Sequence, residues 1–347
     1  SVHPNSKVVI GGPHATMFAS LRRRKLEEIT REELYAFDTN FSSLEVFDQI
    51  IEGEEMGIFE AIMGLENGNP IKWVNAGTTQ NINELPFPAR DLINMDEYTY
   101  KDNGKPKFEL NGGPATSVMS QRGCPFGCRF CAGRDVSQYR QIRDPKTKMV
   151  RAHSAERMVA EFNMLNEQFG FTRFMIYDDE LNLENKRFIG LMTALEENNK
   201  VKIAEGKEPY SYRGFVKSEI FAKHPEQAEY MMRAGFNELL SGFESGSNRI
   251  LKGHVVKNTT AEINYAASRL AFEHGMKVKA LTMIGHPTET YDDIMMTWEF
   301  LDSIGKMAQH YGQGWNFDVT VLTPYPGSPI YDNMVQNNGR FRDEFPR

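Results

Sequence analysis

The stretch QRGCPFGCRFCAG, residues 121–133, contains all three cysteines of the 347-residue chain, at positions 124, 128 and 131. An odd number of thiols in so short a segment does not form a disulfide framework, and a zinc site would need a fourth nitrogen or sulfur ligand. Three thiolates suit a cubane of four irons and four sulfides, because one iron is then left open to bind a substrate. A zinc knuckle completed by a distant histidine and a chance group of buried cysteines are the alternatives.

The glycines of this stretch favour the cluster interpretation. Gly123, Gly127 and Gly133 lack side chains, so a short loop can wrap a cluster without steric conflict. The loop also follows directly after the first strand of an expected α/β barrel, and such barrels place their chemistry at the carboxyl ends of their strands.

The chain from about residue 114 onward predicts a partial (β/α)6 barrel of the α/β class. Short β-rich runs alternate there with helical patterns, which is typical of β/α units closing a parallel sheet. The six expected strands are 115–120, 173–177, 212–216, 238–243, 278–284 and 317–322. Among the intervening helices, Gly170 is expected to end one, and Thr259 with Glu262 is expected to form the capping box of another, which ends at Gly275. A sheet of six such units is open at one side.

The residues ahead of the barrel predict a partial doubly wound, Rossmann-like domain. The segment 6–16, SKVVIGGPHAT, is read as a buried strand ending at Gly11 and Gly12, and 46–62 as a strand turning into a helix. Pro86 and Pro88 indicate an ordered linker. The expected boundaries are 1–80 for the remnant, 81–113 for the linker, 114–335 for the barrel and 336–347 for a C-terminal tail.

Net charge and hydrophobicity limit the kinds of partner that we expect. The formal charge of −7 and the pI near 5.7 argue against a nucleic-acid partner, which usually demands a basic face. No stretch reaches the roughly 18 to 20 consecutive apolar residues that a membrane span needs. We therefore expect a cytoplasmic protein without a membrane span.

The segment CPFGCRFC, residues 124–131, resembles the CxxxCxxC motif of the radical S-adenosylmethionine (SAM) enzymes. Segments 174–188, 235–252, 278–294 and 321–334 resemble later strands of the same family, in the same order. Segments 8–16, 50–55 and 82–93 resemble the end of the cobalamin-binding domain and the linker of one subgroup. The resemblance makes cobalamin a possible cofactor. The DxHxxG segment of that subgroup is absent from this chain, however, so we expect this chain by itself to bind cobalamin weakly or not at all.

The resemblance implies a 4Fe-4S cluster on Cys124, Cys128 and Cys131, with SAM chelated to its open iron. It implies reductive cleavage of SAM to a 5'-deoxyadenosyl radical, hydrogen abstraction from a small-molecule substrate, and a reducing partner such as flavodoxin or ferredoxin. Methyl transfer is the expected reaction, because no thiols remain for the auxiliary cluster of other branches. Cobalamin-free radical cyclisation or rearrangement and a non-catalytic iron-sulfur redox sensor are the alternatives.

The resemblance also implies which residues contact SAM, although it assigns no catalytic residue. One member of an acidic trio is expected at the amino group, Glu244 and Ser245 at the ribose, and two basic residues at the carboxylate. The implied set is Phe130, Asp178, Asp179, Glu180, Arg213, Lys217, Glu244, Ser245, Ile284 and Tyr325. The alternatives are a helix N-cap at Asp179 or Asn182, surface charges at Arg213 and Lys217, and a structural turn at Glu244.

Overall fold

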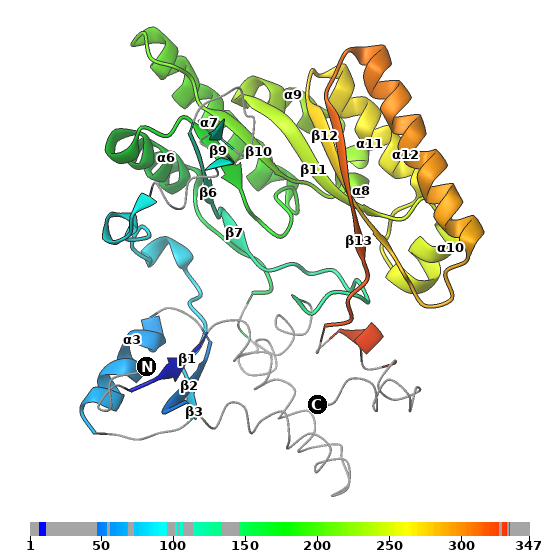
Figure 1. Ribbon diagram of the computed structural model, residues 1–347. Helices are drawn as coiled ribbons and strands as arrows, with labels where there is room; N and C mark the ends of the chain where they lie inside the picture. The colour runs from blue at the N-terminus through cyan, green and yellow to red at the C-terminus, as the bar shows by residue number, and fades with distance from the viewer. Residues whose placement is uncertain are drawn as a thin grey trace, which may run out of the picture. The chain divides into compact units, whose positions relative to one another are not determined.

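The computed structural model of the protein describes residues 7–11, 47–53, 56–68, 73–95, 101–102, 105–106, 114–133, 146, 148–325, 328–331 and 333 (Figure 1). The chain divides into two compact units. Unit 1 comprises residues 1–85, 123–151 and 323–347, and unit 2 comprises residues 86–122 and 152–322. The linker from Pro86 onward thus belongs with the barrel, and the cysteine loop belongs with the N-terminal strands. Of the expected features, Gly12 and the tail 336–347 lie outside the described residues.

Unit 2 contains the six strands that the sequence predicts, joined in one parallel sheet of order β6-β9-β10-β11-β12-β13. The strands are β6 (Ala115–Val118), β9 (Arg173–Ile176), β10 (Ser211–Phe215), β11 (Phe236–Glu244), β12 (Lys277–Ile284) and β13 (Trp315–Val321). Because all six run in the same direction, their carboxyl ends share one edge of the sheet. The α/β partial barrel is confirmed.

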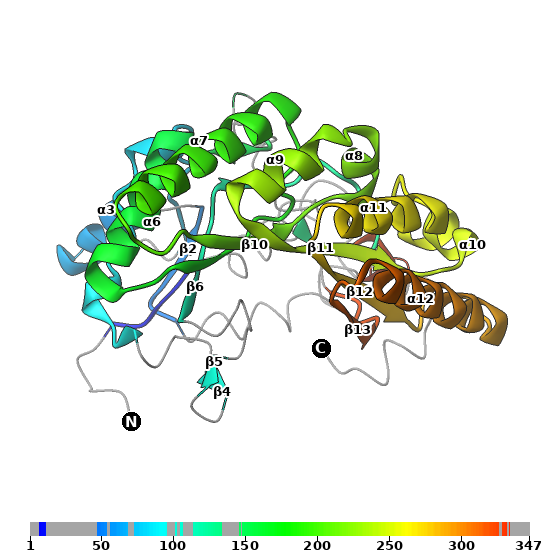
Figure 2. The same ribbon diagram turned by 90° about the horizontal axis from the view of Figure 1, so that it is seen from above.

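The helices of unit 2 cover one side of the curved sheet (Figure 2). They are α6 (Ala155–Phe169), α7 (Asn185–Ala204), α8 (Ser218–Lys223), α9 (Glu226–Ala234), α10 (Asn248–Ile250), η4 (Leu251–Val255), α11 (Ala261–Glu273) and α12 (Tyr291–Tyr311). The main core lies between this layer and the sheet, with Phe162, Phe174 and Tyr212 in mutual ring contact. No described helix is long and apolar enough to cross a membrane.

Helix ends follow from local chemistry, with one correction to the sequence-based prediction. Gly170 ends α6 in the left-handed conformation, with φ of 74°, as predicted. The cap of α11 is Thr260 instead of Thr259, because the Thr260 side chain accepts from the Ile263 amide while Thr259 bonds to Asn264.

The start of α7 excludes the helix N-cap that was the alternative role of Asp179 and Asn182. Neither Asp179 nor Asn182 caps that helix, which begins after Glu184 without a side-chain cap. Asn182 is instead fully buried, and its Oδ1 accepts from the Lys217 amide at 2.9 Å. Its amide nitrogen donates to Gln227 at 3.0 Å, so Asn182 ties the ends of β9 and β10 to α9.

The two faces of the sheet differ in character because successive side chains alternate. Ile176, Val216 and Leu239 belong to the core under the helices. The opposite, concave face carries Tyr177 and Phe215, whose rings meet edge to face with centroids 5.6 Å apart.

Unit 1 contains a short parallel sheet of order β1-β2-β3, comprising β1 (Val9–Ile10), β2 (Gln49–Glu52) and β3 (Trp73–Asn75). Helix α3 (Met56–Glu66) follows β2, as the sequence predicts, whereas β3 is a third strand that the sequence analysis does not identify. Ile50 is the buried centre of this three-stranded sheet and packs against Ile10, Phe47 and Trp73.

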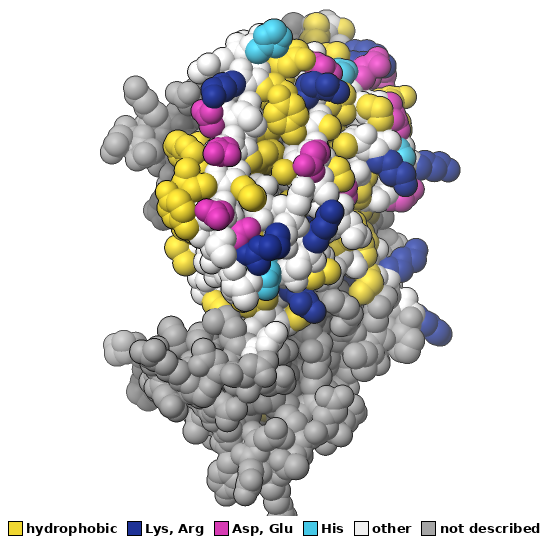
Figure 3. All heavy atoms as spheres, turned by 90° about the vertical axis from the view of Figure 1, so that its right-hand side faces the viewer, with side chains coloured by type: hydrophobic (Ala, Val, Ile, Leu, Met, Phe, Trp, Pro, Cys, Tyr) yellow, Lys and Arg dark blue, Asp and Glu magenta, His cyan; other side chains and the backbone are white. Residues whose placement is uncertain are grey.

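The other elements that the structure describes are short. They are η2 (Ile82–Glu84), η3 (Arg90–Leu92), β4 (Lys101–Asp102), β5 (Lys105–Pro106), β7 (Gln121–Arg122) and β8 (Arg151–Ala152). On the face of the molecule shown in Figure 3, acidic and basic side chains are interspersed among hydrophobic ones.

Candidate cofactor site

The cysteine loop of unit 1 has a defined backbone. The Cys131 amide donates to the Cys128 carbonyl at 3.1 Å, and the Gly133 amide donates to the Cys131 Sγ at 3.2 Å. Gly123 has φ of 93°, and a Cβ there would collide with the Met149 carbonyl oxygen, so only glycine suits the start of the loop. An amide pointed at sulfur stabilises a thiolate, which is the form that ligates iron.

The three thiols form no disulfide; Cys131 is exposed, and Cys124 and Cys128 are half-buried. Within the described ranges, no three His, Cys, Asp or Glu side chains converge on a point that would hold a single metal ion. A cubane takes one cysteine on each of three different irons. The three thiols of this loop, with the amide that contacts the Cys131 Sγ, are a donor set of that kind.

Two further predicted residues also lie in unit 1. Phe130 is half-buried between the last two cysteines, and the carbonyl of its neighbour Arg129 accepts from the Ile330 amide at 3.1 Å. Tyr325 has 60% of its surface exposed, and its carbonyl accepts from the amide of Ser328 at 3.0 Å.

The acidic trio at the end of β9 separates into three environments. Asp178 is buried and accepts from the amides of Ser120, at 2.6 Å, and Gln121, at 3.0 Å. Burial raises its pKa to about 6. Asp179 is exposed, and Glu180 is partly buried. Asp178 thus joins β6 to β9, which leaves Glu180 as the member placed among other buried charges.

Five charged side chains form what we call the strand-end cluster: Glu180, Lys217, Glu219, Glu244 and Lys257. The Lys217 Nζ lies 2.8 Å from the Glu219 carboxylate, and the Lys257 Nζ lies 3.1 Å from the Glu244 carboxylate. Burial raises the pKa of Glu180 to about 7; both lysines oppose the rise, and the other two glutamates add to it. Among the described residues, this cluster thus places three carboxylates near two ammonium groups.

The backbone at Glu244 is strained. Its φ of 61° is in the left-handed region, which is uncommon for residues other than glycine, and its pairing with β12 shifts register after Gly242. A Cβ at Gly242 would collide with the Glu244 carboxylate, so the glycine makes room for it. Strain of this kind persists where surrounding structure enforces it, and it gathers at ligand sites.

The structure places the other predicted residues of unit 2 in supporting positions. Arg213 lies within β10 and pairs with Glu238 at 3.0 Å, so it contacts a neighbouring strand and is not a surface charge. Ser245 is fully buried, with its hydroxyl 3.1 Å from that of Thr297 on α12. Ile284 is the half-buried last residue of β12. Three residues of the expected set, Glu180, Lys217 and Glu244, interact electrostatically in the structure, and their contact with SAM stays a prediction.

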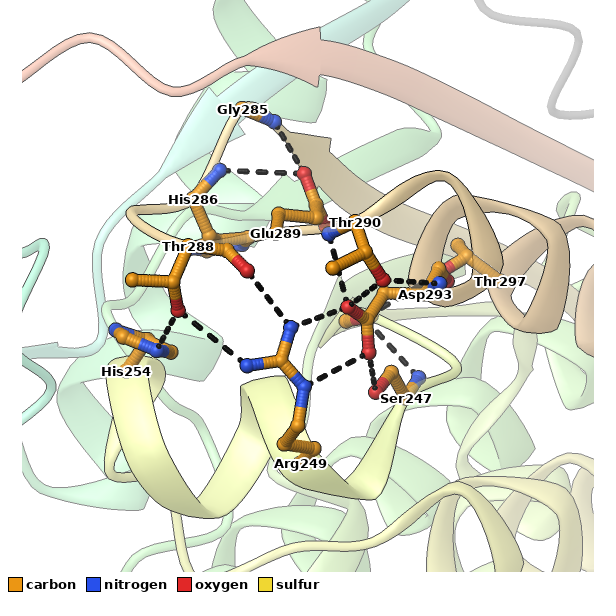
Figure 4. Close-up of polar contacts among 11 residues, drawn as sticks. Ser247, Arg249, His254, Gly285, His286, Thr288, Glu289, Thr290, Asp293 and Thr297 are labelled. Carbon is orange, nitrogen blue, oxygen red and sulfur yellow. Dashed lines mark hydrogen bonds and ion pairs between the residues drawn. The ribbon is translucent and has the colours of Figure 1, made fainter.

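A polar clamp connects the loops after β11 and β12 (Figure 4). Asp293, the third residue of α12, accepts from the Ser247 hydroxyl at 2.6 Å and pairs with Arg249. It also completes a capping box with Thr290. The hydrogen bond from Arg249 holds the Asp293 pKa far below its usual range, so the carboxylate is charged at any physiological pH. Arg249 also donates to the Thr288 carbonyl at 2.8 Å.

Sequence reasoning missed two residues near the strand ends, Glu219 and Lys257. Lys257 lies beyond α10 and η4, so its distance along the chain from Glu244 conceals their ion pair.

The family model of the radical SAM superfamily matches residues 118–301, more than half of the chain. The chain belongs to the radical SAM superfamily, and its cofactors are accordingly a 4Fe-4S cluster and SAM. SAM carries a sulfonium and an ammonium against one carboxylate, so its net positive charge fits the excess of carboxylates in the strand-end cluster.

The chain is also similar to named proteins. It is 28% identical to an uncharacterized methyltransferase of Pyrococcus horikoshii, over 97% of this chain and 65% of that protein. It is 23% identical to an anaerobic magnesium-protoporphyrin IX monomethyl ester cyclase of Cereibacter sphaeroides, over 96% of this chain and 49% of that one. The chain spans about half to two thirds of the length of these relatives.

Among solved structures, the cobalamin-dependent S-adenosylmethionine radical enzyme OxsB matches with a TM-score of 0.50 and 17% identity, covering 96% of this chain and 59% of that chain. At this identity the likeness concerns the fold. It extends over almost the whole chain, so it includes the N-terminal strands as well as the barrel.

Proposed function

We propose that the chain cleaves SAM reductively at a 4Fe-4S cluster on Cys124, Cys128 and Cys131, and that it serves methyl transfer to a small-molecule substrate. The observation that carries the proposal is the strand-end cluster, a buried region with excess negative charge at the carboxyl ends of a parallel sheet. The bound cluster and SAM supply a 5'-deoxyadenosyl radical for hydrogen abstraction. A one-electron donor such as flavodoxin or ferredoxin would supply the electron.

The residues of this chain have the task of binding and orienting SAM. Glu180 is proposed to receive the ammonium group, because its pKa is raised to about 7 and a cation beside it would stabilise its charged form. Glu244 is proposed to accept from the ribose hydroxyls, since a carboxylate can accept two hydrogens at once. Lys257 holds Glu244 in place through its contact at 3.1 Å and through a second bond to the Gly242 carbonyl at 2.6 Å.

The names of the relatives support methyl transfer as the reaction. Besides the Pyrococcus protein, a bacteriochlorophyllide d C-8(2)-methyltransferase of Chlorobaculum tepidum is 22% identical over 82% of this chain. The cyclase similarity favours radical ring closure as a second candidate. Cobalamin is a proposed additional cofactor, supported by the parallel β1-β2-β3 sheet and by the likeness in fold to OxsB.

The concave face of the sheet suggests the character of the substrate. Met119 and Tyr177 are neighbours across β6 and β9, with the Tyr177 amide donating to the Val118 carbonyl at 2.7 Å. They have 44% and 55% of their surface exposed, and the ring of Tyr177 meets that of Phe215 edge to face. Exposed apolar and aromatic side chains in a row favour a ligand with an apolar, ring-bearing surface. We propose a substrate of that kind.

The reaction products separate the candidates. The anaerobically reconstituted, reduced protein would be incubated with SAM carrying a deuterated methyl group, with and without hydroxocobalamin and candidate ring-bearing substrates. The proposed methyl transfer consumes two molecules of SAM: one gives up its methyl group and leaves S-adenosylhomocysteine and a labelled product, and the other leaves 5'-deoxyadenosine and methionine after hydrogen abstraction. Formation of 5'-deoxyadenosine with an unlabelled cyclised product would favour ring closure. A protein that binds its cluster and leaves SAM intact would contradict the proposed function.

A further inference from the structure

The concave face of the six-stranded sheet, which lies opposite the helices, is apolar along the first three strands of the sheet order (Figure 2). Met119 and Tyr177 directly follow β6 and β9, and Phe215 ends β10. These side chains form the row that favours a ring-bearing substrate. The same face has a different character at β12 and β13, so a ligand that lies across it would meet two kinds of surface.

Lys279 of β12 and Asp318 of β13 carry the charge of this second region. Both neighbours of Lys279 on β12 belong to the core, and Phe317 packs against that core, so Lys279 and Asp318 point to the concave side. The Lys279 Nζ lies 2.8 Å from the Asp318 carboxylate. Asp318 is the register partner of Leu281, two residues beyond Lys279. The ammonium group therefore reaches toward the carboxyl ends of the strands, where the strand-end cluster lies.

The two side chains of this ion pair differ in burial. Asp318 has 49% of its side-chain surface exposed, whereas Lys279 has 20%. Among the described residues, Asp318 is the one ion-pair partner of Lys279. An ion pair to a half-exposed carboxylate contributes little, because water competes for the charges. By comparison, the pair of Arg213 and Glu238 on the same face is closed, with 6% and 16% exposed. A ligand anion can therefore replace Asp318 beside Lys279 at little cost.

We propose that Lys279 binds an acidic group of the substrate, such as a carboxylate, and so selects a substrate that joins an apolar ring system to an acid. The inference rests on the proposed function and names the substrate class of the same site. The ring lies on the apolar row, and the acid takes the place of the Asp318 carboxylate. In the ligand-free protein Asp318 occupies that place, so it acts as a competitor of the substrate.

The test uses two fluorescent probes that share a ring system and differ in charge, pyrenebutyrate and pyrenebutanol. They are titrated into the anaerobically reconstituted protein without turnover, and the wild type should bind the acid more tightly than the alcohol. Lys279→Met should weaken binding of the acid by about tenfold and leave that of the alcohol unchanged, because a charge-assisted hydrogen bond is lost. Lys279→Arg, which keeps the cation, should retain the preference for the acid.

Asp318→Asn should act in the opposite direction. It removes the competing charge, so affinity for the acid should rise by about two- to fivefold. A loss of structure would weaken both probes in both variants, and it would not give effects of opposite sign. Lys306 and Asp302 offer a matched control, because they form an exposed ion pair of 2.6 Å on α12. Lys306→Met and Asp302→Asn should change the affinity for neither probe.

Tyr177→Ala should weaken both probes alike, because both carry the ring. Unchanged affinity for both in this variant would overturn the inference, since the probes would then lie off this face. Equal effects on acid and alcohol in Lys279→Met, or a wild type that binds neither probe or both equally, would also overturn it. SAM cleavage is measured separately. A reconstituted protein that leaves SAM intact would overturn the proposed function, whatever the probes show.

Discussion

The cysteine loop and the strand-end cluster contrast in how the chain assembles them. The loop gathers its donors within one segment, from Cys124 to Cys131, and its shape follows from short-range amide bonds and glycine. The cluster draws Glu180, Glu244 and Lys257 from different loops, which only a completed sheet brings together. A local site should therefore fail completely when one ligand is lost, whereas a distributed site should weaken by degrees.

The largest effect is expected in the cysteine loop. Changing any one of Cys124, Cys128 or Cys131 to Ala should abolish the cluster, because each thiolate ligates a separate iron. The measurement is iron and acid-labile sulfide per chain after anaerobic reconstitution, where the wild type should bind about four irons. Glu244→Gln is the control and should keep its iron. A wild-type protein that bound one zinc ion and no iron would contradict the iron-sulfur cluster and with it the comparison of the two sites.

The next effect is expected at Glu244. Glu244→Gln removes a charged acceptor from a buried site, so SAM binding should weaken by about tenfold or more, from a loss of about 1.5 to 3 kcal/mol. Anaerobic equilibrium dialysis with labelled SAM measures it. Glu238→Gln, a change on the same strand at the partner of Arg213, should lower stability and leave SAM affinity unchanged. Equal affinities for Glu244→Gln and wild type would take Glu244 out of the site.

A smaller effect concerns the titration of Glu180. Its pKa is raised to about 7 in the ligand-free protein, and a cation beside it would stabilise the ionised form and lower that pKa. SAM binding near and below pH 7 should therefore release a proton, and affinity should rise by up to about tenfold between about pH 6 and about pH 8. Glu180→Gln is the control for the titration of SAM itself. The pH dependence of SAM affinity that remains in this variant is due to SAM, and the pH dependence that it loses is due to Glu180. Identical pH profiles would place the ammonium group elsewhere.

The smallest effect on binding is expected at Asp178, although it ends the same strand. Asp178→Asn weakens the acceptor of two backbone amides, so the free energy of unfolding should fall by about 1 to 3 kcal/mol. The affinity for SAM should stay within about twofold, because the Asp178 carboxylate is bound to the protein's own amides. Urea unfolding and dialysis measure the two quantities. A large loss of affinity with unchanged stability would assign Asp178 to SAM instead of Glu180.

The sequence predicts the parts of the molecule whose signal is local or periodic. Six strands and the glycine end of α6 follow from hydrophobic runs and a left-handed turn, and the cysteines follow from spacing. The cap of α11 is misplaced by one residue because Thr259 and Thr260 are adjacent, and only packing decides which faces the helix amides. β3 is missed because three residues carry too weak a pattern.

The candidate site is predictable to a lesser degree. Glu180 and Glu244 are recognisable as strand-end carboxylates, but the sequence does not distinguish Asp178, which accepts from backbone amides, from Glu180 two positions later. The amides in question belong to Ser120 and Gln121, which follow β6 and are remote in the chain. Lys257 pairs with Glu244, which lies 13 residues away in the chain, so no local motif indicates this contact.

The carboxylate of Asp293 serves two structures at once, since it completes the capping box of α12 and receives Arg249 from the loop after β11. Helix nucleation and loop closure thus share one group, and neither can open without disturbing the other. In native-state hydrogen exchange, the first-turn amides of α12 and those around Ser247 should therefore exchange as a single cooperative unit. A ligand bound by the loop would then slow exchange in a helix that it does not touch.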